Sequence, residues 1–153
     1  MRAALMLAGA LALGRIGGTA LADAAWCPDL ARVTDLAATN KLGYIAGLAR
    51  AGSFSDTTLP LPGWRDCSLY GSRTYTCDSQ AFRTAGEAER ALAALVAEVK
   101  DCLGAAWSKD ESRSSPVYVV VRNERDAVSI TLSTDQADDA AHVVRLTLFL
   151  RGR

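Results

Sequence analysis

Four cysteines that follow a signal-like N-terminal segment constrain the fold of this chain more than any other feature. Met1-Arg2 give a cationic start, Ala3 to Gly14 are small and apolar, and Ala22 to Ala25 suit cleavage by signal peptidase. The apolar stretch is too short to span a membrane. We therefore expect residues 1–25 to be a Sec-type signal peptide and residues 26–153 to form one domain in an oxidising compartment, either the periplasm or the exterior of a bacterial cell. The cysteines beyond the cut are Cys27, Cys67, Cys77 and Cys102.

The spacing of these cysteines favours two structural disulfides over a zinc site or a redox centre, since no C-x-x-C pair is present. In a hairpin centred on Ser72, Cys67 faces Cys77 at a distance that a disulfide spans. Cys102 then pairs with Cys27, and we favour this connectivity. A one-residue slip of the hairpin would remove it. The alternative joins Cys77 to Cys102 and Cys27 to Cys67.

Composition excludes several classes of partner. The 17 basic and 17 acidic residues cancel, which leaves no electrostatic footprint for nucleic acid or for anionic lipid. No apolar run after the signal reaches 18 residues, so we expect no integral membrane segment. Trp26 stands immediately before Cys27, where lipoprotein processing needs a small residue, and this argues against a lipid anchor. Few lysines and many alanines are typical of a GC-rich bacterial genome.

An α+β fold is expected, with an antiparallel sheet covered by one long helix and a short N-terminal helix. Thr84 and Glu87 form a capping box, an apolar stripe follows, and Gly104 suits a helix end. These signals predict a helix from Ala85 to Leu103. Pro28 to about Thr39 predicts the short helix, because proline is favoured in the first helical turn.

Two groups of strands are expected in the sheet. A hairpin runs from Cys67 to Cys77 around Gly71-Ser72. Apolar residues continue or alternate in three later segments with short connectors, which predicts a C-terminal antiparallel meander: Val117–Arg122, Val128–Ser133 and Val144–Arg151. Weaker patterns suggest a strand at Tyr44–Leu48, an edge strand at Thr57–Leu59 and a polar loop at Lys109–Pro116. The order helix, strands, helix, strands hints at a duplicated α-β-β-β plan, although no residue-level repeat supports it.

Signals for catalysis are weak. His142 is the one histidine, and no nucleophile motif such as Gly-x-Ser-x-Gly accompanies it. Asp135, Asp138 and Asp139 lack the order of a calcium-binding loop. We therefore expect a non-enzymatic protein with no metal and no cofactor. The alternative is a small periplasmic hydrolase that uses His142.

Aromatic side chains give the best indication of a binding site. Trp64 and Tyr70 form the candidate patch, because such side chains combine apolar area with a polar tip. Tyr75 shares a hairpin face with Leu69 and belongs to the core, whereas Tyr70 points the other way. We expect the domain to bind an envelope protein or a glycan. An inhibitor of an envelope-attacking enzyme and a subunit that pairs through a sheet edge are alternative roles.

Overall fold

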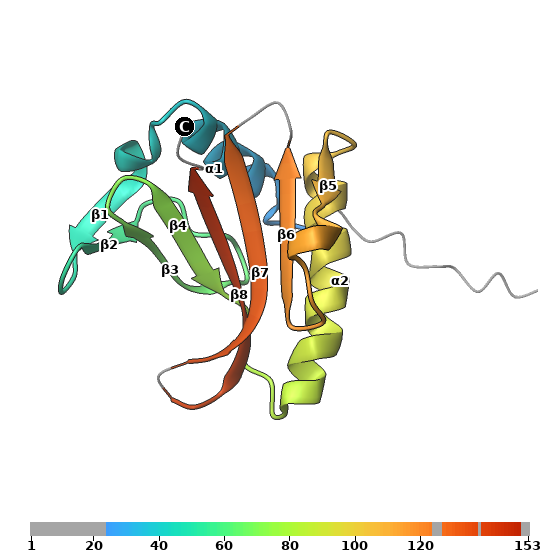
Figure 1. The fold of residues 1–153 in the computed structure, drawn as a ribbon. Coiled ribbons are helices and arrows are strands. Elements are labelled where there is room, and N and C mark those ends of the chain that lie inside the picture. Colours follow the sequence, from blue (N-terminus) through green and yellow to red (C-terminus); the bar gives the residue numbers. More distant parts are fainter. Residues whose placement is uncertain (1–23, 124–126, 138, 151–153) are drawn as a thin grey trace, which may run out of the picture.

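The computed structural model describes residues 24–123, 127–137 and 139–150, so residues 1–23 of the expected signal peptide lie outside it. One antiparallel sheet runs in the order β1-β2-β3-β4-β8-β7-β6-β5 (Figure 1). The helices are α1 (Cys27–Ala38) and α2 (Ala85–Leu103), with short 3-10 turns η1 (Leu42–Ile45) and η2 (Glu111–Arg113). The strands are β1 (Ala46–Ala49), β2 (Phe54–Thr57), β3 (Arg65–Tyr70), β4 (Thr74–Asp78), β5 (Trp107–Lys109), β6 (Tyr118–Asn123), β7 (Val128–Gln136) and β8 (His142–Leu150).

The two helices cover one face of this sheet. They contact each other, and both contact β7 and β8, so they lie on the same side (Figure 1). Within the described residues the opposite side carries no α-helix, and we call it the open face. The predicted α+β class, with an antiparallel sheet, is confirmed, but the cover consists of two helices and not of one.

Helix α2 forms where its local signals predict it. The Oγ1 atom of Thr84 accepts a hydrogen bond from the backbone N–H of Glu87 at 3.2 Å. The carboxylate of Glu87 accepts in turn from the backbone N–H of Arg83 at 2.9 Å. These bonds satisfy donors that the first turn leaves without partners. At the other end, Gly104 has a φ of +81°, a conformation that glycine adopts at little cost.

The N-terminal hairpin contains one irregularity that matters for the site. Strands β3 and β4 pair as predicted, with Tyr70 opposite Thr74. Further along, the register shifts, so that two residues of β3, Asp66 and Cys67, oppose one residue of β4. Asp66 has a φ of +49°, as a residue in a β-bulge can. A bulge reverses the faces of all side chains that precede it.

The last strand of the chain joins the two parts of the sheet. The predicted meander of β6, β7 and β8 is present. β8 also pairs with β4, where Thr147 lies opposite Thr76. Each part of the chain therefore contributes a helix followed by four strands, where the sequence hinted at three.

Three short segments differ from the prediction. Residues 42–45 form η1 before β1 begins, and β2 ends where the predicted edge strand begins. β5 ends at Lys109, the first residue of the predicted polar loop. Each strand concerned has only three or four residues, too few for a periodic pattern to identify. Trp107 of β5 is 7 % exposed and belongs to the core.

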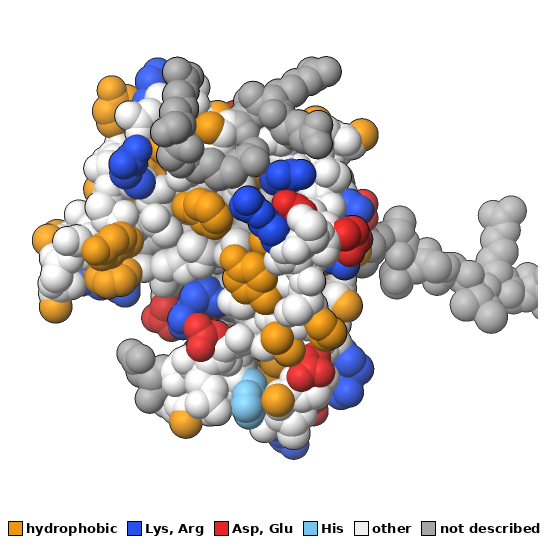
Figure 2. All heavy atoms as spheres, viewed as in Figure 1, with side chains coloured by type: hydrophobic (Ala, Val, Ile, Leu, Met, Phe, Trp, Pro, Cys, Tyr) orange, Lys and Arg blue, Asp and Glu red, His pale blue; other side chains and the backbone are white. Residues whose placement is uncertain are grey.

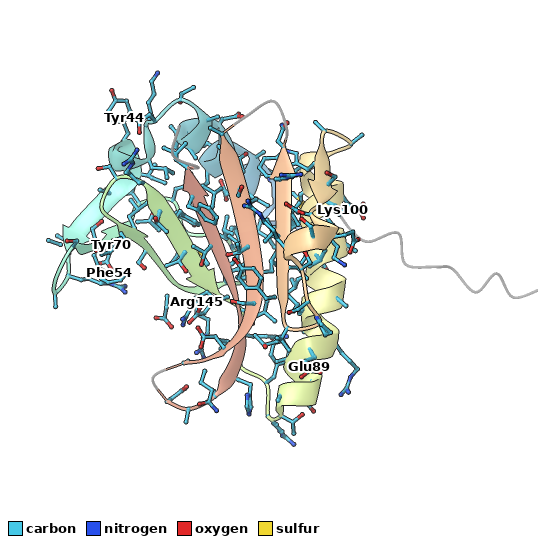
Figure 3. The ribbon with its side chains drawn as sticks, in the orientation of Figure 1. Tyr44, Phe54, Tyr70, Glu89, Lys100 and Arg145 are labelled. Atoms are coloured by element: carbon cyan, nitrogen blue, oxygen red, sulfur yellow. A yellow bond between two sulfur atoms is a disulfide. The ribbon has the colours of Figure 1, made fainter. Side chains whose placement is uncertain are left out.

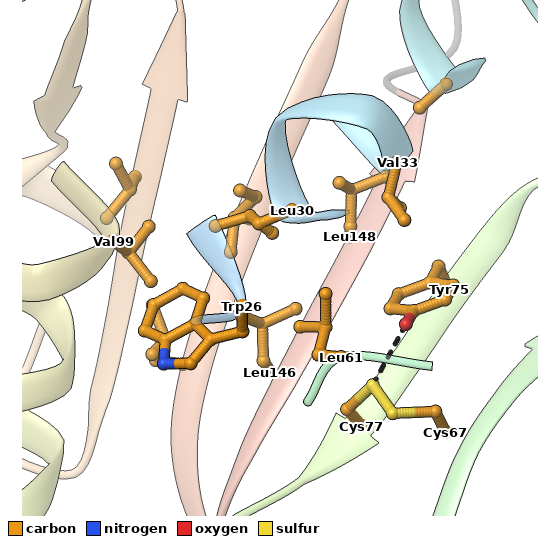
Figure 4. Close-up of a cluster of buried hydrophobic side chains, with 14 of the residues drawn as sticks. Trp26, Leu30, Val33, Leu61, Cys67, Tyr75, Cys77, Val99, Leu146 and Leu148 are labelled. Carbon is orange, nitrogen blue, oxygen red and sulfur yellow. Dashed lines mark hydrogen bonds between the residues drawn. A yellow bond between two sulfur atoms is a disulfide. The ribbon is translucent and has the colours of Figure 1, made fainter. Parts of the chain in front are cut away.

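The core lies between the helices and the sheet. Leucine, valine and aromatic side chains from α1, α2, β4 and β8 meet there (Figure 4). Tyr75 is fully buried, as predicted, and its hydroxyl donates to the carbonyl of Leu59 at 2.8 Å. Burial raises the pKa of this phenol.

The structure contains two disulfides with the connectivity that the sequence favours. Cys27 is bonded to Cys102, and this bond ties the start of α1 to the end of α2. Cys67 is bonded to Cys77 across the hairpin, with a Cα–Cα distance of 4.1 Å. One bond thus links the two helices, and the other links two neighbouring strands of the sheet.

Candidate binding site on the open face of the sheet

A hollow of about 830 Å³ lies on the open face, over β2, β3, β4 and β8. Its lining side chains come from residues that alternate with those facing the helices, so they share one side of the sheet. Apolar rings, hydroxyls and charged groups all contribute to it. Figure 2 shows hydrophobic, basic and acidic side chains on this face of the molecule. The lining residues are Arg50, Phe54, Arg65, Asp66, Ser68, Tyr70, Thr74, Thr76, Asp78, Ala137, Asp139, Arg145 and Thr147.

Phe54 and Tyr70 form the aromatic part of this hollow, and we call them the aromatic pair. They lie directly opposite each other on β2 and β3, with ring centroids 5.0 Å apart and planes inclined at 53°. Tyr70 is 52 % exposed and Phe54 is 44 % exposed. Figure 3 shows the two side chains close together at one end of the sheet, with Tyr44 at a distance from both. Their cross-strand contact stabilises the sheet and leaves apolar area accessible.

The structure does not bring Trp64 together with Tyr70. Strict alternation would place both on the open face, but the bulge at Asp66 lies between them and turns Trp64 to the helix side. There Trp64 is partly buried and packs edge-on against Trp26, with ring centroids 5.7 Å apart. The candidate patch therefore contains Tyr70 with Phe54 as its partner. Trp64 lines a separate hollow of about 370 Å³ beside α2.

The charged part of the hollow centres on Arg145, and we call Arg145, Asp78 and Asp135 the arginine cluster. The guanidinium of Arg145 donates two hydrogen bonds to the carboxylate of Asp78, at 2.7 and 3.0 Å. It also donates to the carboxylate of Asp135. Asp78 is 6 % exposed. A bidentate arginine–carboxylate pair fixes both partners in position, so the cluster gives the hollow a rigid end (Figure 3).

Hydroxyl groups cross the middle of the hollow, and we call Ser68, Thr74, Thr76 and Thr147 the hydroxyl belt. Ser68 lies opposite Thr76, and Thr76 lies opposite Thr147, so the belt spans β3, β4 and β8. The Oγ1 atoms of Thr76 and Thr147 are 3.4 Å apart. Among the described residues, the hydroxyls of Ser68 and Thr74 make no hydrogen bond. Ser68 is only 5 % exposed, so the half-buried threonines of the belt supply most of the donors and acceptors for a ligand.

A turn built around Asp110 covers the part of the open face near β6 (Figure 1). The carboxylate of Asp110 accepts from the hydroxyl of Ser112 at 2.7 Å and lies 3.3 Å from the guanidinium of Arg122. The hydroxyl of Ser114 donates to the carbonyl of Asp110 at 2.7 Å and accepts from the N–H of Val120 at 3.1 Å. The Ser112 hydrogen bond and the positive charge of Arg122 lower the pKa of Asp110.

This lowered pKa predicts a loss of stability in acid. Because the folded state holds the charged form of Asp110, its contribution is present above the ordinary carboxyl range near pH ~4 and disappears as the pH falls through the lowered value. Asp110→Asn should reduce the free energy of unfolding at neutral pH. It should also make that free energy fall less steeply as the pH is lowered, which flattens the acid limb of the stability profile. Urea unfolding between about pH 2 and 7 measures both effects. Ser112→Ala should flatten the limb in part; an unchanged limb in both variants would contradict the assignment.

The structure places His142 away from the hollow, whereas Asp135 and Asp139 lie at its charged end. His142 starts β8, and its carbonyl accepts from the N–H of Phe82 at 2.8 Å. Within the described part of the chain, its imidazole makes no hydrogen bond and lines none of the hollows described above. Asp135 belongs to the arginine cluster, and a carboxylate oxygen of Asp139 accepts from the N–H of Ala141. Asp138 lies outside the described residues.

Two features of the site escape the sequence analysis. Phe54 is recognisable as a partner of Tyr70 only once β2 is known to pair with β3. The arginine cluster joins Asp78 to Arg145 across 67 residues, and no local pattern announces such a pair. The alternation of Thr74, Thr76 and Asp78 along β4 was the one available signal, because it marks a polar face.

Comparison with protein-family models, with curated proteins and with solved structures finds no match to this chain. None of the helices in the described segments is long and apolar enough to cross a membrane. The same segments contain no group of three or more His, Cys, Asp or Glu side chains arranged to hold a metal ion. The geometry of the open face is therefore the basis for assigning a role.

Proposed function

We propose that this protein is a binding protein without catalytic activity, and that the open face of its sheet holds a protein or glycan partner. The observation that carries the proposal is the exposed aromatic pair beside a hollow with a fixed charged end. Tyrosine and arginine are enriched at the centres of binding sites, and tyrosine provides contact area at a low cost in side-chain entropy. Tyr70 and Arg145 supply both residue types to the same hollow.

The rigidity of the hollow supports a role in binding. Its floor consists of three strands that pair continuously, β3, β4 and β8. The hairpin disulfide and the arginine cluster hold these strands at two further points. A preformed surface loses little conformational entropy when a partner docks, which raises its affinity for that partner.

The envelope of a bacterial cell is the proposed location of this activity. Two disulfides fit a protein that folds in an oxidising compartment. The expected signal peptide would direct the chain there, and its removal would leave the domain that carries the hollow.

Removing one aromatic ring tests the proposal. The oxidised domain, immobilised on beads, should retain a component of an envelope extract, and Tyr70→Ala should lose at least about nine-tenths of that component. Tyr44→Ala is the matched control, because Tyr44 is 80 % exposed and lies outside the hollow. It should retain the component as wild type does. Equal retention by all three proteins, or retention by none, would contradict the proposed function.

A further inference from the structure

We infer that the ligand of the open face is an uncharged oligosaccharide, an inference that rests on the proposed function and narrows its partner class. The hollow offers unpaired hydroxyls and an exposed aromatic pair, while Arg50 and Arg145 are already held by carboxylates. A ligand that matches this combination has many hydroxyl groups, apolar ring faces and no net charge.

Two of the three arginines of the hollow are held by carboxylates. Its described lining includes three arginines and three aspartates. Arg145 is bonded to Asp78 and to Asp135, and Arg50 is bonded to Asp56. The third arginine, Arg65, lies 4.0 Å from the carboxylate of Asp66, and its Nε makes no hydrogen bond within the described residues. With Asp56 and Asp135 included, the carboxylates outnumber the arginines, so the hollow has no excess positive charge to attract an anionic ligand. A charged ligand would have to break an existing ion pair, at the cost of leaving a partner without its counter-charge.

Unlike the charged groups, the hydroxyl belt has side chains that make few hydrogen bonds within the protein. Ser68 and Thr74 make no side-chain hydrogen bond among the described residues, and Thr76 and Thr147 share one contact of 3.4 Å. Each hydroxyl offers one donor and two acceptor positions. Sugar hydroxyls have the same capacity, so belt and ligand can exchange hydrogen bonds in both directions without any change of protonation.

The aromatic pair supplies the apolar contact that hydroxyls alone lack. One face of a pyranose ring exposes mainly C–H groups, which pack against the face of an aromatic side chain. Tyr70 on β3 lies directly opposite Thr74 on β4, and both line the hollow. A sugar ring on Tyr70 would therefore place its hydroxyls over the belt. The volume of about 830 Å³ lies in the range of small-ligand sites, which suits a few sugar rings.

Titration with defined oligosaccharides tests this inference. Amide NMR spectra of the oxidised domain are recorded with three uncharged hexasaccharides (chitohexaose, cellohexaose and maltohexaose) and with an anionic heparin hexasaccharide. At least one uncharged probe should shift amides of β3, β4 and β8, with an affinity that is constant between about 50 and 500 mM salt. Tyr70→Ala should weaken that affinity about tenfold or more, and Thr76→Val should weaken it about threefold. Tyr44→Ala should leave it unchanged.

The alternative outcomes separate this inference from the proposed function. If no uncharged probe shifts the spectrum, or if only heparin binds and salt abolishes its binding, the inference is wrong. If the extract yields a protein whose retention needs Tyr70 while no sugar binds, the proposed function stands and the glycan assignment fails. Binding of an uncharged probe that Tyr70→Ala leaves intact would overturn the placement on the open face. The dispersion of each variant's spectrum shows directly whether it is folded.

Discussion

Replacing both Cys27 and Cys102 by alanine is expected to lower the free energy of unfolding by about 4.5 kcal/mol. The disulfide between them closes a loop with a sequence separation of 75 residues, and a cross-link over so long a loop strongly restricts the unfolded chain. A domain of this size has a net stability of about 5–15 kcal/mol, so the double variant should be marginal. Urea unfolding followed by circular dichroism measures the difference.

The hairpin disulfide provides the matched comparison. Cys67 and Cys77 are separated by 10 residues, and the same relation gives a loss of about 2.7 kcal/mol for the variant that lacks both. The ranking of the two double variants is therefore part of the prediction. A larger loss for the hairpin pair, or a change below about 1 kcal/mol for the helix-linking pair, would show that chain entropy does not govern these cross-links.

Leu148→Ala is expected to lower the free energy of unfolding by about 3 kcal/mol. Leu148 lies on β8, opposite Tyr75 of β4 and Ile130 of β7, and it is fully buried on the helix side. Truncation removes apolar contacts where three strands meet, and the surrounding sheet cannot collapse to fill the cavity. Thermal and urea unfolding both measure the loss.

Phe149→Ala is the control for this prediction. Phe149 is the next residue on β8 and points to the open face, where it is partly buried and lines a shallow hollow. Its removal should lower the free energy of unfolding by only about 1 kcal/mol, clearly less than Leu148→Ala, although the deleted side chain is larger. If the two variants lost equal stability, the assignment of the two faces of β8 would be wrong.

Local signals in the sequence predict the elements that depend on neighbouring residues. The capping box at Thr84 and the apolar stripe after it suffice for α2, because both act within one helix. The hairpin around Gly71 and the alternation in β7 and β8 depend on a turn and on a buried face. In contrast, β5 has three residues and is defined by its pairing with β6. Such a partner becomes known only from the fold.

The candidate site follows the same division. Tyr70 is predictable because alternation along β3 places it on the opposite side from Leu69, which shares a face with Tyr75 on the paired strand. The prediction that Trp64 shares a patch with Tyr70 is wrong, because one extra residue at Asp66 reverses the side of the sheet on which Trp64 lies. Sequence periodicity does not reveal a bulge occupied by aspartate. Arg145 was missed because its partner Asp78 lies on a strand that becomes its neighbour only in the folded sheet.

The central position of β8 determines the order in which this sheet can be completed. As the chain emerges from its amino end, β4 has an unpaired edge until residues 142–150 arrive to occupy it. Open strand edges invite pairing with other chains, so the incomplete polypeptide is prone to aggregate during synthesis or transport. Closure then requires contacts between residues some seventy positions apart, such as Thr76 and Thr147, and contacts of this range slow folding. A holding chaperone that shields the edge of β4 would therefore raise the yield of native protein.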